Sequence, residues 1–167
     1  MKLGLVKVGL DLSGARAAAV EMIGKTVSEV SISQVIVSEM VEHDEEYYVA
    51  VKSTRDGAEL LLASMGGIEV ESNWEKIKNL AIPLGEEPKM KDLTDLAKSA
   101  GFDEALVPRV ASFMNKLFKC YDQEDGNYME SNPLVRRSSN GELTALDAVT
   151  MVDGDARFRH PDWNFSF

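Results

Sequence analysis

The spacing of apolar residues predicts three amphipathic helices and several strands. Hydrophobic side chains recur every three or four positions in segments typical of helices with one buried face. These segments are 13–23, 91–100 and 103–121, and Ser13 is the expected cap of the first. Runs of branched and apolar residues predict strands instead. The expected strands are 3–10, 30–41, 47–53 and 58–63, with a run at 35–37 that could be buried on both faces.

Two turn signals predict antiparallel hairpins. Asp56-Gly57 lies between two of these strands, and Asn140-Gly141 lies between the runs 128–135 and 146–148. Asn-Gly suits a tight hairpin because both central residues of the favoured two-residue turns need a positive φ. Helices inserted between antiparallel hairpins predict an α+β fold, in which an antiparallel sheet is layered with helices.

Asn132 and Asp147 lie on the two sides of the second turn, fifteen residues apart. If the two runs pair as a hairpin, both side chains can point to the same side of the sheet. One amide and one carboxylate oxygen suit a Mg²⁺ ion that keeps most of its waters and bridges nucleotide phosphates. In a simpler interpretation Asn-Pro ends a strand, Asn-Gly makes a turn, and Asp147 is a buried or capping acid. The hairpin alone leaves both interpretations open.

Composition excludes several classes of protein. The 167 residues suffice for one substantial core. A net charge of −10 argues against binding to nucleic acid or to an anionic membrane, where a basic surface supplies most of the affinity. No apolar run approaches the ~18 residues of a membrane span, and no signal peptide is recognised. The single cysteine, Cys120, is expected to be a buried thiol and indicates a reducing compartment such as the cytoplasm.

Several ordered motifs resemble one enzyme family. They are Glu-Ser-Asn-Pro-Leu-Val at 130–135, Leu-Asp-Ala at 146–148, Phe-Arg-His-Pro at 158–161, and the segments 34–39, 45–49 and 64–71. Their sequence and order resemble the ATP-grasp domain of ADP-forming acyl-CoA ligases. These include the β subunit of succinyl-CoA synthetase, ATP-citrate lyase and citryl-CoA synthetase. Met65, Ser131 and Val149 replace an acid, an apolar residue and a lysine that are usual in the family.

The resemblance implies a partial ATP-grasp fold. Residues 1–41 would be the remainder of the first lobe, and residues 42–167 the second lobe with a Mg²⁺-binding hairpin. Because residues 2–7 resemble the sequence just after the family's Gly-rich phosphate loop, that loop is expected upstream, and CoA-ligase elements are expected downstream. We therefore expect a fragment that has weak activity or none by itself.

The family's nucleotide and metal ligands map onto particular residues by the same resemblance. Asn132 and Asp147 would bind Mg²⁺. Glu39 would contact the adenine at the hinge between lobes. Glu46 would accept hydrogen bonds from the ribose hydroxyls, with Glu45 as the competing choice. A carboxylate can accept from two hydroxyls at once, so either acid is chemically suited.

Glu130 corresponds to the family's acid near a phosphohistidine that relays the phosphoryl group and belongs to a partner subunit or domain. His43 is expected to be solvated, and His160 to make a structural hydrogen bond. The implied function is ATP-dependent ligation of citrate to CoA, with MgATP bound here and CoA and the acid bound through a partner subunit or missing domain. Succinate is the alternative acid. A non-catalytic module that associates with a partner subunit is the alternative of another class.

Overall fold

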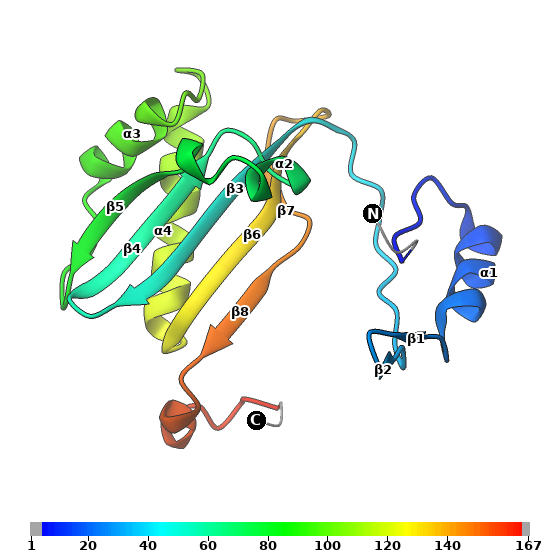
Figure 1. Ribbon diagram of the computed structural model, residues 1–167. Coiled ribbons are helices and arrows are strands. Elements are labelled where there is room, and N and C mark those ends of the chain that lie inside the picture. Colours follow the sequence, from blue (N-terminus) through cyan, green and yellow to red (C-terminus); the bar gives the residue numbers. More distant parts are fainter. Residues whose placement is uncertain (1–4, 165–167) are drawn as a thin grey trace. The chain divides into compact units, whose positions relative to one another are not determined.

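The chain separates into two compact units, Met1–Glu42 and His43–Phe167. The computed structural model describes residues 5–164 (Figure 1). The boundary between the units lies within one residue of the division expected from the sequence. The assignment of the two units to the two ATP-grasp lobes stays a prediction.

The first unit holds one helix and two short strands, α1 (Leu12–Met22), β1 (Thr26–Val27) and β2 (Val30–Ser31). Asp11 caps α1 in place of the expected Ser13, and its carboxylate accepts a hydrogen bond from the Gly14 amide at 2.7 Å. The expected strand over 3–10 is wrong for residues 5–10, which are not a strand, while residues 3 and 4 lie outside the described residues.

The expected strand over 30–41 is also wrong, since only its first two residues form β2. Ile36 lies in the run that could have been buried on both faces, and it is 96% exposed. An extended segment becomes a strand only when a neighbour pairs with its backbone groups. Within residues 5–164, β2 pairs with β1 alone, and no strand pairs with residues 33–41.

The second unit is a layered α+β structure, which confirms the expected fold class. Its strands are β3 (His43–Thr54), β4 (Gly57–Ala63), β5 (Lys78–Pro83), β6 (Gly126–Arg137), β7 (Leu143–Ala145) and β8 (Val149–Val152). Its helices are α2 (Ile68–Glu71), η1 (Trp74–Lys76), α3 (Met90–Ser99), α4 (Val107–Gln123) and η2 (Gly154–Arg159). The strand order is β5-β4-β3-β6-β7, β8 also pairs with β6, and every pairing is antiparallel.

The main core lies between this sheet and helices α3 and α4, which cover one of its faces (Figure 1). On β3, Tyr47, Val49 and Val51 point into this core, and each is at most 3% exposed. Helix α4 buries the apolar stripe that its sequence predicts, with Met114 fully buried. Cys120, expected to be buried, lies on the exposed side of α4. The helical layer therefore leaves the opposite face of the sheet available for other roles.

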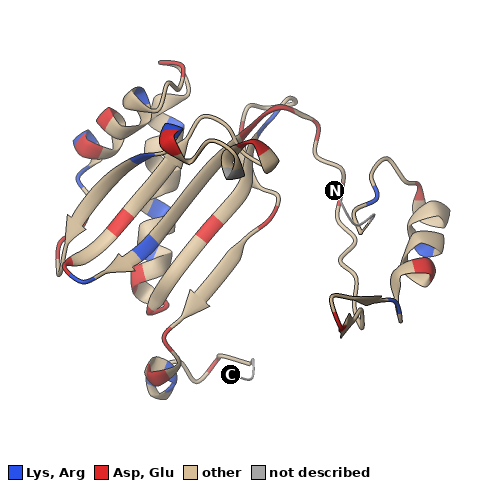
Figure 2. Cartoon of the chain, viewed as in Figure 1, with Lys and Arg blue, Asp and Glu red and all other residues tan. Residues whose placement is uncertain are grey.

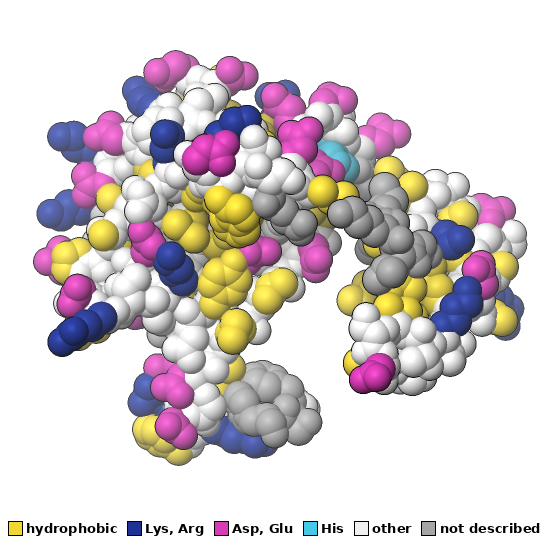
Figure 3. All heavy atoms as spheres, viewed as in Figure 1, with side chains coloured by type: hydrophobic (Ala, Val, Ile, Leu, Met, Phe, Trp, Pro, Cys, Tyr) yellow, Lys and Arg dark blue, Asp and Glu magenta, His cyan; other side chains and the backbone are white. Residues whose placement is uncertain are grey.

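That opposite face, here called the open face, is only partly covered. A small buried cluster lies on it, made of Tyr48, Ala50, Ala63 and Val70. Trp74 of η1 packs edge-on against Tyr48, with 6.3 Å between ring centroids. Charged residues occur within the strands (Figure 2), and Lys52 Nζ lies 2.8 Å from Glu59 Oε2. Hydrophobic side chains also gather on this face (Figure 3), including the half-exposed Val149 and Met151 of β8.

Both expected turns join antiparallel strands, although the expected run 146–148 is not a strand and lies between β7 and β8. Arg55 and Asp56 connect β3 to β4. Between β6 and β7 the loop is longer than a two-residue turn, because the Arg137 amide donates to the Glu142 carbonyl at 2.9 Å. Among its residues only Gly141 has a positive φ, of 69°, so the Asn-Gly signal predicted the hairpin but not its turn type. Arg109 of α4 donates a hydrogen bond to the Gly141 carbonyl and ties this loop to the helical layer.

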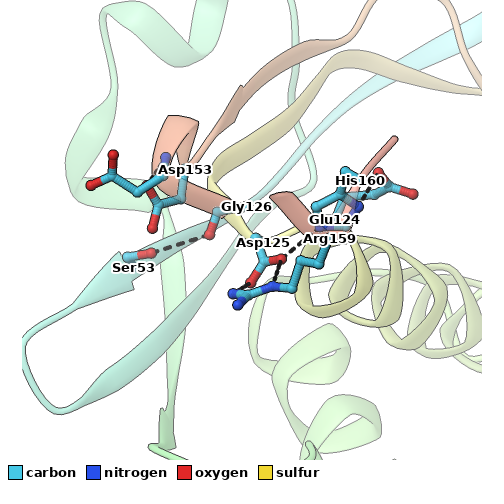
Figure 4. A network of polar contacts seen from close by, with 8 residues as sticks. Ser53, Glu124, Asp125, Gly126, Asp153, Arg159 and His160 are labelled. Carbon is cyan, nitrogen blue, oxygen red and sulfur yellow. Dashed lines mark hydrogen bonds and ion pairs between the residues drawn. The ribbon is translucent and has the colours of Figure 1, made fainter. Parts of the chain in front are cut away.

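A polar cluster holds the last described segment against the junction of α4 and β6 (Figure 4). Asp125 accepts hydrogen bonds from Arg159 and from His160, the latter at 2.6 Å. These contacts, with the Arg159 bond as the largest cause, hold the pKa of Asp125 well below its usual range. His160 also stacks on Trp163, with ring centroids 4.1 Å apart, and Trp163 donates to Glu124. The hydrogen bond expected for His160 is therefore confirmed.

Candidate functional site

Strand β6 carries polar residues on the open face, on the side away from α3 and α4. Tyr128 packs against the small open-face cluster, whereas Met129 belongs to the main core. Because side chains alternate along a strand, Glu130 points to the same face as Tyr128, and Asn132 continues that row. Glu130 and Asn132 are both partly exposed. One strand thus presents two of the expected site residues to the same side.

Asn132 is anchored by a glycine loop that follows β4. The Gly67 amide donates to Asn132 Oδ1 at 2.6 Å, and Asn132 Nδ2 donates to the Gly67 carbonyl at 3.5 Å. Only glycine allows this approach. Gly67 has a φ of +59°, and a Cβ on Gly66 would lie 2.6 Å from the carbonyl oxygen of Tyr47. The likeness of segment 64–71 to the family did not predict this role for its two glycines.

Asp147 lies opposite Asn132 in the strand register. Leu134 pairs with Ala145 on β7, and Glu130 pairs with Val149 on β8. These two pairs belong to one register, so the unpaired segment between β7 and β8 brings Asp147 alongside Asn132. Leu134 belongs to the main core, whereas Glu130 points to the open face, so side-chain alternation is interrupted between the two pairs. The register therefore places Asp147 next to Asn132 without fixing the face to which its side chain points. Asp147 is exposed, and its Oδ1 accepts a hydrogen bond from the Ala148 amide at 2.8 Å.

The structure separates the two candidate ribose-binding acids. Glu46 lies beside the glycine loop, because a Cβ built on Gly67 would clash with its carboxylate. Glu45 instead accepts a hydrogen bond from the Tyr47 hydroxyl at 2.7 Å and pairs with Arg136 at 3.4 Å. Gly67 therefore contacts Asn132 while lying next to Glu46, and Glu45 is engaged elsewhere.

Glu39 and His43 lie close in the sequence to the boundary between the two units. Glu39 is an exposed residue of the first unit, in the segment after β2. His43, expected to be solvated, is only 18% exposed in its side chain, and its Nε2 lies 3.4 Å from Glu46 Oε1. The expectation for His43 is wrong because β3 begins at this residue and carries it into the sheet.

The donor set around Asn132 fits a hydrated magnesium ion better than a metal held by protein alone. Among the described residues, no three His, Cys, Asp or Glu side chains group closely enough to hold a metal. Magnesium usually keeps several waters and takes one or two protein oxygens together with substrate phosphates. Asn132 Oδ1 accepts one hydrogen bond and has a second lone pair, and the Asp147 carboxylate also has acceptor capacity beyond its bond to Ala148.

Comparison with known proteins identifies the class that this fold and site define. A family model described as "ATP-citrate synthase ATP-grasp domain" matches residues 1–163, and the chain belongs to this family. Its fold also matches an ATP citrate lyase from Methanothrix soehngenii, solved in complex with citrate and coenzyme A. That match has a TM-score of 0.80 at 23% identity, and covers 99% of this chain and 40% of the other.

Curated proteins of two kinds are similar to this chain. The chain is 31% identical over 163 residues to ATP-citrate synthase alpha chain protein 2 of Oryza sativa subsp. japonica, with 95% of this chain and 38% of that protein covered. It is 32% identical over 176 residues to a succinate–CoA ligase [ADP-forming] subunit beta of Persephonella marina, covering 96% and 45%. The chain thus spans less than half the length of these relatives. None of the helices within residues 5–164 is long and apolar enough to cross a membrane.

Proposed function

We propose that this chain is the ATP-grasp part of an ATP-dependent acid–CoA ligase of the ATP-citrate synthase type. It binds MgATP for transfer of the γ-phosphoryl group, and the complete enzyme forms an acyl-CoA. The observation that carries the proposal is that Asn132, anchored by the Gly67 amide, lies alongside the segment between β7 and β8 that holds Asp147. Membership of the family supplies the chemical context for these two oxygens.

The proposal gives each candidate residue one role. Asn132 and Asp147 would hold Mg²⁺. A bound Mg²⁺ ion would neutralise the negative charge on the nucleotide phosphates during phosphoryl transfer. Glu46 accepts hydrogen bonds from the ribose, and Glu39 contacts the adenine. Glu130 is the catalytic acid that meets the phosphorylated group of a partner. Phosphoryl transfer requires little covalent work from the protein, so positioning and electrostatics are the main contributions of these residues.

The substrate and partners follow from the relatives and extend the proposal. Citrate is the proposed acid, and succinate is the alternative, because both kinds of ligase occur among relatives of similar identity. CoA and the acid bind through a partner subunit or further segments in a hetero-oligomer located in the cytoplasm. In a competing hypothesis the chain is a non-catalytic module that only associates with a partner subunit.

Calorimetric titration of the purified chain with ATP tests the nucleotide and metal roles. We expect binding that requires Mg²⁺ and that weakens at least about tenfold in Asn132→Ala and in Asp147→Ala, since bonds to charged groups contribute about 1.5–3 kcal/mol. Asn115→Ala and Asp122→Ala are matched controls on α4, on the far side of the sheet, and should bind as the wild type does.

Two results would contradict the proposal. Metal-dependent binding that is equally strong in both site variants would exclude these residues as ligands. If the chain binds no MgATP even when joined to a segment that supplies the phosphate loop, the association module becomes the better account. A turnover assay on this chain alone should show little or no ligase activity, because it spans less than half of its relatives.

A further inference from the structure

Two tyrosine hydroxyl groups connect to Glu130 on the open face. The Tyr48 hydroxyl lies 3.2 Å from the Tyr128 hydroxyl, and the Tyr128 hydroxyl contacts Glu130 Oε2. The three residues come from the neighbouring strands β3 and β6, and the Tyr48 side chain is almost completely buried. The sequence motifs alone predict no role for either tyrosine.

Chemistry fixes the direction of these hydrogen bonds. An ionised carboxylate only accepts, so the Tyr128 hydroxyl donates to Glu130. The Tyr128 oxygen then accepts from Tyr48, whose hydroxyl is the first donor of the series. Burial is the main cause that raises the pKa of each tyrosine, and Glu130 raises the pKa of Tyr128 further. Both hydroxyls therefore keep their protons at neutral pH and remain donors.

The cross-strand neighbours of Glu130 cannot hold its carboxylate in the same way. Ala50 pairs with Glu130 from β3, and Val149 pairs with it from β8. Neither side chain has a polar group, so Glu130 has no polar partner within its own row of the sheet. A glutamate side chain has several rotatable bonds, and fixing them in advance lowers the entropic cost of a reaction that needs one geometry.

We propose that Tyr128 is a positioning residue for Glu130, supported from behind by Tyr48. The hydroxyl series holds one carboxylate oxygen within the sheet and directs the other toward the open face. This inference rests on the proposed function, because it deepens the role of Glu130 in phosphoryl transfer. The contact itself belongs to the folded chain and can be tested without any activity.

Kinetics of the complete enzyme, with this chain in place, test the positioning role. Tyr128→Phe should lower kcat about 10- to 100-fold, the effect of losing one hydrogen bond to a charged group, and leave the KM for MgATP within about twofold. Tyr48→Phe should have a smaller effect of the same kind. Tyr121→Phe is the matched control, since its hydroxyl bonds to Ser53 at 2.7 Å on the other side of the sheet. It should leave both constants unchanged.

Nuclear magnetic resonance of ring-labelled tyrosine in the chain alone tests the contact separately. Glu130→Gln should shift the ring resonances of Tyr128, because its hydroxyl then donates to a neutral amide in place of a carboxylate. Unchanged Tyr128 resonances would overturn the contact. A wild-type kcat in Tyr128→Phe would overturn the positioning role even if the contact is present. If the complete wild-type enzyme shows no phosphoryl transfer, both the positioning role and the proposed function are overturned. The magnetic resonance experiment would still decide whether Tyr128 contacts Glu130.

Discussion

Gly66→Ala should disturb the stability of the second unit and the metal ligand at the same time. Gly66 precedes the residue whose amide holds Asn132, and it lies against the backbone of Tyr47 in the central strand β3. A Cβ at position 66 would lie 2.6 Å from the Tyr47 carbonyl oxygen and 2.8 Å from its nitrogen. Since both neighbours are backbone atoms of a buried residue, no side chain can rotate away to make room.

The size of the effect follows from these distances. Ordinary contacts begin at 3.4 Å, so the loop must retreat by about 0.8 Å from its 2.6 Å approach. The same retreat would stretch the bond from the Gly67 amide to Asn132 Oδ1 from 2.6 Å to about 3.4 Å, beyond ordinary hydrogen-bond length. Overpacking of this kind costs about 1–3 kcal/mol, and the lost hydrogen bond adds about 1 kcal/mol. We expect a total destabilisation of about 2–4 kcal/mol.

Urea unfolding followed by tryptophan fluorescence measures this loss, because Trp74 and Trp163 both belong to the second unit. MgATP affinity, measured by calorimetry, should fall in parallel. Gly85→Ala is the control, since Gly85 has a φ of +78° with nothing within 4 Å of a built Cβ. It adds backbone strain of about 1–2 kcal/mol and should leave nucleotide affinity unchanged. A Gly66→Ala unfolding free energy within 0.5 kcal/mol of the wild type would refute the close packing described here.

Two further predictions concern the scaffold. Met114→Ala should lower the free energy of unfolding, measured in urea, by about 2–5 kcal/mol, because the side chain is fully buried between α4 and the sheet. Cys120→Ala on the exposed side of α4 is the control and should change that free energy by less than about 0.5 kcal/mol. Asp125 stabilises the fold above the unfolded-state pKa of about 4 and loses this contribution as pH falls through its lowered folded-state pKa. The stability difference between wild type and Asp125→Asn should therefore be largest near neutral pH and shrink in acid, and a difference that is constant with pH would contradict the ion pair.

The residues of the β6–β7 hairpin show how far sequence reasoning reached. Strand alternation and a glycine turn predicted a hairpin on which Asn132 and Asp147 could face the same side. The hairpin is present and its register brings Asp147 alongside Asn132, while the common side of the two side chains stays a prediction. The same reasoning failed for the run at 35–37. There the local pattern was apolar, but pairing depends on whether another strand lies alongside, and the described residues supply none. Local periodicity predicts a conformation, while a ladder also needs a partner from a distant part of the chain.

The sequence by itself determined the helical stripes of α3 and α4, the two hairpins, and the family to which the ordered motifs belong. Only the tertiary structure decided that Gly67 holds Asn132. It also decided that Glu46, and not Glu45, lies beside Gly67. The link from Tyr48 through Tyr128 to Glu130 is likewise a tertiary contact. The physical reason is separation along the chain. Gly67 and Asn132 are 65 residues apart, and Tyr48 and Tyr128 are 80 apart. Such contacts arise from sheet register and close backbone approach, which periodicity within one segment does not specify.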